Sequence, residues 1–191
     1  MKRIFSICAV LVLGACNPLY NGGGQPLAQM TFDHIRPYPL YVASYETVPF
    51  NRGFNNPLPE GFVADPGDLV HRYFSRRFEA VGAQGKFQVV IQDASVEHKL
   101  VESENKVGSM LGVDKSDHYL VRVNVKLQTY GVGDEDQTLT LTVYRNIFVS
   151  EHSSIVAREK AQIRAMDSLI DDLDVYVRKI LKDKYNLMDG S

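Results

Sequence analysis

The chain has 191 residues, of which 45% are apolar, and its ten tyrosines and nine phenylalanines supply large side chains for one hydrophobic core. Its 21 basic and 23 acidic side chains leave a formal charge of -2, which excludes the strongly basic surface typical of nucleic-acid-binding domains. We therefore expect a folded domain, not a disordered chain, with no nucleic acid among its partners.

Residues 1–16 have the organisation of a bacterial export signal. Two basic residues precede a largely apolar run over residues 4–13, and the small residues Gly14 and Ala15 follow. The run is shorter than the roughly 20 residues that a bilayer-spanning helix needs. We interpret it as a removable signal.

The tetrapeptide Leu13-Gly14-Ala15-Cys16 resembles the lipobox of bacterial lipoproteins. The resemblance implies cleavage before Cys16 and acylation of its thiol and new amino group, so that fatty-acyl chains such as palmitate hold the protein at a membrane. Asn17 stands where an aspartate commonly retains such lipoproteins at the inner membrane. We therefore expect a lipid-anchored outer-membrane protein facing the periplasm. The alternative is an ordinary secretory signal that contains a cysteine.

Three segments are predicted along the chain. Residues 1–15 form the signal peptide, residues 16–29 a lipidated flexible tether rich in glycine, and residues 30–191 a single periplasmic domain. Because Cys8 leaves with the signal and Cys16 is lipidated, the folded domain has no thiol for a disulfide, a nucleophile or a metal.

The domain begins with a predicted strand over residues 41–48, which are rich in β-branched and aromatic side chains and lie between Pro39 and Pro49. A long loop is expected over residues 50–64.

A helix is then predicted over residues 66–81, with Asp65 as its N-cap and Gly82 as its C-cap. Its apolar residues recur at helical spacing and are Val70, Phe74, Phe78 and Val81.

Alternating apolar side chains predict three further strands, over residues 86–92, 119–127 and 138–143. The first of them continues less cleanly to Leu100, and a polar turn over residues 131–136 joins the last two. An amphipathic helix over residues 155–184 completes the domain. The order β-α-β-β-β-α predicts an α+β fold, a four-stranded, largely antiparallel sheet with two helices on one face.

Arg145 interrupts this pattern, because it continues the inward phase of Leu139, Leu141 and Val143. We favour a bulge or strand end that turns the arginine outward. If Arg145 faces inward, it should pair with a carboxylate, because an unpaired buried charge costs several kcal/mol.

No recognisable catalytic motif is present, so we expect no catalytic residue, metal or cofactor. We interpret the five histidines as exposed, and the aspartates at 167, 171, 172 and 174 as a solvated helix face. The alternative is an envelope enzyme with a dispersed site, which would require a cleft gathering His98 or His118 with Asp117 or Glu97.

Two loops are candidates for contact with a partner or with lipid. Residues 107–113 are apolar and hinged by glycine, and they include the candidates Met110, Leu111 and Val113. The loop over residues 50–62 contributes the other two candidates, Arg52 and Phe54. In the alternative reading, the first loop covers the core and the second packs over the edge of the sheet.

The start Cys16-Asn17-Pro18-Leu19-Tyr20 and the long C-terminal helix are similar to the lipopolysaccharide-assembly lipoprotein family. The order of elements also resembles the auxiliary lipoproteins of ABC-type lipid transporters. These resemblances imply a non-catalytic accessory or binding subunit in envelope assembly or lipid transport, with an envelope protein as partner. The alternative is a structural envelope lipoprotein.

Overall fold

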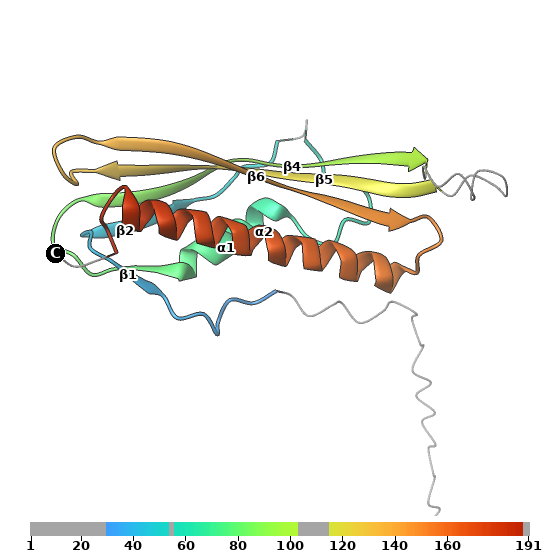
Figure 1. Cartoon of the computed structure of the whole chain (residues 1–191), viewed down its shortest axis with the longest axis horizontal. Helices are drawn as coiled ribbons and strands as arrows, with labels where there is room; N and C mark the ends of the chain where they lie inside the picture. The colour runs from blue at the N-terminus through green and yellow to red at the C-terminus, as the bar shows by residue number, and fades with distance from the viewer. Residues whose placement is uncertain (1–29, 54–55, 103–114, 189–191) are drawn as a thin grey trace, which may run out of the picture.

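The structure is a computed structural model that describes residues 30–53, 56–102 and 115–188 (Figure 1). The elements follow in the order β1 Tyr38–Leu40, β2 Ser44–Val48, α1 Pro66–Arg77, β3 Phe78–Ala80, β4 Lys86–Glu102, β5 Lys115–Tyr130, β6 Gln137–Ser150 and α2 Ile155–Asp183.

A four-stranded sheet in the order β2-β4-β5-β6 forms one layer, and α1 and α2 together form the other (Figure 1). β4, β5 and β6 pair antiparallel, whereas the edge strand β2 runs parallel to β4. β1 and β3 form a separate two-stranded parallel sheet. The predicted α+β fold is confirmed, with a mixed sheet in place of a fully antiparallel one.

The hydrophobic core lies between the inner face of the sheet and the two helices. Alternate residues of β5 point inward, and those from Val121 to Leu127 are fully buried. Phe74 of α1 and Leu173 of α2 are equally buried against this face. A register shift between Ile91 and Asp93 of β4 returns Ala94 to the core, which explains why the alternation in this strand weakens after residue 92.

The first strand differs from its prediction over residues 41–48, because only Ser44–Val48 belongs to the large sheet. The amide of Val42 donates to the carbonyl of Leu40 at 2.8 Å, and this tight turn ends β1 and buries the Val42 side chain. Pro39 lies inside β1 instead of before the strand.

The first helix begins as predicted and ends four residues early. Asp65 caps it by accepting from the amide of Gly67 at 2.7 Å. Its last residue is Arg77, because Phe78 has extended backbone and starts β3, which pairs with β1. Gly82 is therefore not the C-cap. A Cβ atom there would collide with the backbone of Tyr41, so close approach of two backbones requires glycine at this position.

The remaining elements are confirmed, and the strands are longer than their patterns indicated. The turn after Tyr130 is closed by Asp136, whose carboxylate accepts from the amide of Gly131 at 2.9 Å. α2 begins at Ile155, where Ser154 caps it by accepting from the amide of Ala157 at 3.2 Å.

Candidate functional site

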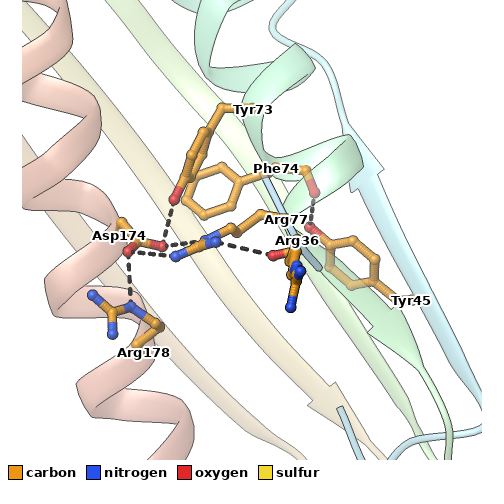
Figure 2. A network of polar contacts seen from close by, with 7 residues as sticks. All are labelled: Arg36, Tyr45, Tyr73, Phe74, Arg77, Asp174 and Arg178. Carbon is orange, nitrogen blue, oxygen red and sulfur yellow. Dashed lines mark hydrogen bonds and ion pairs between the residues drawn. The ribbon is translucent and has the colours of Figure 1, made fainter. Parts of the chain in front are cut away.

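Asp174 of α2 is the centre of a buried polar cluster, which Figure 2 shows. Nε of Arg77 donates to its carboxylate at 2.7 Å, and Nη2 does so at 3.0 Å. Nε of Arg178 donates at 2.8 Å, and the hydroxyl of Tyr73 donates as well. A carboxylate accepts about four hydrogen bonds, so both Asp174 oxygens are fully used.

The cluster joins α1 to α2, because Tyr73 and Arg77 come from the first helix, and Asp174 and Arg178 from the second. The guanidinium of Arg77 also lies 4.0 Å from the ring centroid of Tyr38, and Arg178 approaches the same ring at 5.2 Å. The arrangement fixes the two helices and the start of β1 relative to one another.

Burial acts to raise the pKa of Asp174, but hydrogen bonds from Arg77 and Tyr73 and the charges of both arginines outweigh it and hold the pKa below its usual value. Burial also raises the pKa of Tyr73, as does its hydrogen bond to Asp174. Asp174 is therefore charged, and Tyr73 neutral, at neutral pH.

A pocket of about 310 Å³ adjoins this cluster, and His34, Tyr73 and Arg77 are among the residues that line it. Asp167 and Asp171 of α2 line it as well. Burial and the neighbouring charge of Asp171 raise the pKa of Asp167. The reading of the four aspartates as a solvated face is thus only partly correct, because Asp174 is 7% exposed and fully paired.

A second cluster surrounds Asp117 of β5, which is 7% exposed. Nε2 of His98 on β4 lies 2.6 Å from its Oδ1 atom, and Arg158 of α2 forms an ion pair with Oδ2. The ring of His98 stacks on Tyr119 with centroids 4.6 Å apart. Burial acts to raise the pKa of Asp117, but the hydrogen bonds and charges of Arg158 and His98 outweigh this effect and hold the pKa below its usual value. The carboxylate therefore stays charged. The cluster holds the first turns of α2 on the sheet.

The enzyme alternative required a histidine and an acidic residue to lie together in a cleft. His98 and Asp117 are one of the pairs that it named. A carboxylate that orients a histidine is one part of a nucleophilic site, and the other part is a hydroxyl or thiol bonded to the same ring. Over residues 30–53, 56–102 and 115–188, no serine, threonine or cysteine side chain hydrogen-bonds to His98. His118 lies apart from this pair, stacked on Phe148 with centroids 4.4 Å apart.

Arg52, a predicted contact residue, is turned into the molecule, with 15% of its side chain exposed. It forms a bidentate pair with the N-cap Asp65 through Nε at 2.7 Å and Nη2 at 2.8 Å. Its Nη1 atom donates to the carbonyl of Asn56 at 2.9 Å. This placement favours the alternative in which the loop packs over the sheet.

Arg145 faces inward, so the predicted bulge or strand end is wrong. The register of β5 with β6 is unbroken from Ser116 to Thr129, and Val143 and Ile147 on either side of Arg145 are buried. Arg145 pairs with Asp172 of α2 and donates to the carbonyl of Ser168 at 3.1 Å. The carboxylate partner required for an inward arginine is therefore present.

The other predicted site residues lie outside the described residues. These are Cys16, Phe54, Met110, Leu111 and Val113. In the described part of the chain, no three histidine, cysteine or acidic side chains are grouped so that they could hold a metal ion. Neither helix there combines the length and apolar character needed to cross a membrane.

Sequence reasoning missed Asp174, although a signal was present. Asp174 lies four residues after Ile170 and three before Val177, on the apolar stripe of the helix. An acidic residue in that phase is buried on folding and needs a cation. Its partner Arg77 is 97 residues away and has no local signature.

No family model matches the chain, and no curated protein matches it. The chain is similar to a solved minor lipoprotein from Acinetobacter baumannii, with 14% identity, coverage of 80% of this chain and 99% of that one, and a TM-score of 0.40. It is also similar to rare lipoprotein B from Shewanella oneidensis, with 12% identity, coverage of 75% of this chain and 97% of that one, and a TM-score of 0.40.

Proposed function

We propose that this chain is an outer-membrane lipoprotein, anchored through Cys16, that serves as a non-catalytic accessory or binding subunit in envelope assembly or lipid transport. The observation that carries the proposal is the lipobox-like Leu13-Gly14-Ala15-Cys16 directly after a short apolar run. Fatty-acyl chains on Cys16 would hold the domain at the membrane, since each buried methylene contributes roughly 0.8 kcal/mol.

The polar clusters of the domain support a structural role for their carboxylates over a catalytic one. The carboxylates of Asp174 and Asp117 are each bound by arginine, and those arginines tie α2 to α1 and to β5. A general acid or base needs a proton that it exchanges near neutral pH, whereas both of these carboxyl groups have lowered pKa values. We therefore assign them to holding the fold together.

We assign partner or lipid contact to the segment at residues 107–113, which connects β4 to β5. Its apolar residues Met110, Leu111 and Val113 contrast with the polar turn of the next hairpin, at residues 131–136. Connections between strands are ordinarily polar, so an apolar one is a candidate contact surface.

Photo-crosslinking in intact cells tests this assignment. A photoreactive residue replaces Met110 in one variant and the exposed Glu135 in a matched control variant, so that each probe sits in a strand connection of the same sheet. The proposal expects a discrete envelope protein or lipid adduct from position 110 and none from position 135. Equal labelling from both positions, or none from position 110, would contradict it.

A further inference from the structure

The strand β6 forms an open edge of the large sheet. The amides of Gln137 and Glu151 both bond toward β5, to Thr129 Oγ1 at 3.2 Å and to the carbonyl of Lys115 at 3.0 Å. Since backbone groups alternate along a strand and this register is unbroken, the even-numbered residues from 138 to 150 direct their amides and carbonyls away from β5. No strand of the described residues pairs with that edge.

This edge lacks most of the features that usually protect an edge strand. Protected edges are short, bulged, interrupted by lysine or proline, or carry an inward-pointing charge. β6 has 14 residues, an unbroken register, and neither lysine nor proline. Its one charged residue, Arg145, is bound on the inner side by Asp172. The edge is therefore long, regular and without free charge.

Apolar side chains border the open edge on both faces. On the outer face, Tyr144 is 60% exposed and Phe148 is 64% exposed. On the inner face, Leu139 and Leu141 are only partly buried, although they pack against the core. An added strand would remove this surface from water, and exposed aromatic side chains are frequent anchors of protein interfaces.

We propose that two copies of this chain associate through antiparallel pairing of their β6 strands, about a two-fold axis at Tyr144, which joins their two four-stranded sheets into one. A second copy of β6 matches it in length and in the alternation of its side chains. With Tyr144 on the axis, Thr138 faces Ser150 of the second copy, so every even-numbered residue from 138 to 150, whose amide and carbonyl face the open edge, has a partner. Any other axis leaves at least one of these residues unpaired.

The side chains are compatible in this register. Thr140 lies opposite Phe148 of the second copy, and Leu141 lies opposite Ile147, which places apolar and β-branched residues in contact across the interface. Arg145 lies opposite Val143, so like charges do not meet. This inference goes beyond the proposed function and does not depend on lipidation of Cys16.

Disulfide formation tests the register. The full-length chain is purified in detergent with Cys8→Ser and Cys16→Ser, which removes its two native cysteines. A Tyr144→Cys side chain would face its own copy across a hydrogen-bonded pair, where Cα atoms lie about 5.5 Å apart and a disulfide can form. Thr140→Cys is the matched control, because the two copies of position 140 would lie about 26 Å apart, at eight residues of strand rise.

We expect Tyr144→Cys to give at least tenfold more disulfide-linked dimer than Thr140→Cys on mild oxidation. An equal mixture of Thr140→Cys and Phe148→Cys chains should yield dimers that contain one of each. Equal crosslinking at positions 140 and 144, or attachment of Tyr144→Cys to a different protein in a membrane extract, would overturn the proposal.

Sedimentation of the chain without introduced cysteines supplies an independent measurement. We expect a dimer, and a monomer for Thr140→Pro, which removes an amide that faces the open edge and makes no bond within its own sheet. Thermal unfolding checks that this variant is folded. A monomeric unmodified chain at tens of micromolar concentration would overturn the proposal.

Discussion

The inner and outer faces of the large sheet differ in how far their side chains are exposed to solvent. On the inner face, β5 is buried under both helices, and arginine binds the carboxylate of Asp117 there and that of Asp174 on the covering helix α2. On the outer face, polar residues alternate with the exposed aromatic rings of Tyr144 and Phe148. The difference indicates that the inner side chains determine stability, whereas the outer ones are available for contact.

Truncation of one aromatic ring on each face gives the largest predicted difference. Phe87 of β4 is fully buried and stacks with Tyr45 at a centroid distance of 5.9 Å. Phe87→Ala should lower the free energy of unfolding by about 4 kcal/mol, because it leaves a cavity. The control Phe148→Ala, on the outer face, should cost under about 1 kcal/mol. Urea unfolding measures the free energy of unfolding of both variants. Equal losses would contradict the proposed difference between the two faces.

Loss of the Asp174 charge should have the next largest effect on the free energy of unfolding. Asp174→Asn leaves Arg77, whose side chain is 12% exposed, without its anion. We expect a loss of about 3 kcal/mol in the free energy of unfolding, the usual result of breaking a buried ion pair. The control Asp172→Asn changes a carboxylate that is 40% exposed and should cost at most about 1 kcal/mol. The account is contradicted if the two variants are equally stable.

Low pH should reduce the free energy of unfolding by protonating the buried carboxylate of Asp117. The pKa of Asp117 lies below its ordinary value of 3.8 in the folded protein, so its charge stabilises the fold above that pH. This contribution is lost as the pH falls through the lowered pKa. The free energy of unfolding of Asp117→Asn should therefore decline less steeply than that of the unmodified protein from pH 5 downward. Urea titrations at several pH values measure the slope, and an unchanged slope would show that Asp117 does not contribute.

The smallest effect is expected on the inner side of the edge strand β6, where Arg145 pairs with Asp172. Their side chains are 30% and 40% exposed, so solvent screens the pair. A double-mutant cycle with Arg145→Gln and Asp172→Asn should give a coupling of about 0.5 kcal/mol. A coupling above about 2 kcal/mol would mean that this pair belongs energetically to the buried interior.

Local patterns predicted most elements of this fold, and long-range pairing decided where the predictions failed. Asp65 and Pro66 correctly marked the start of α1, because capping depends on neighbouring residues. Its end was misplaced because Phe78 fits a helical spacing equally well and joins β3 only through pairing with the distant β1.

The candidate site was less predictable than the fold, for the same physical reason. His98 and Asp117 meet across the β4–β5 register, which includes the shift between Ile91 and Asp93. Arg77 and Asp174 meet only when two helices pack together. The inward phase of Arg145 was visible in the sequence, and the alternation there was a better guide than the cost of burying a charge.

The mass of the N-terminal peptide of the mature protein tests the central claim most directly. The full chain is expressed in a Gram-negative host, isolated from the membrane fraction and digested, and its N-terminal fragment is measured. Our account predicts a chain that begins at Cys16 and carries the added mass of fatty-acyl groups on that residue. An unmodified Cys16, or a mature chain that begins elsewhere, would contradict it.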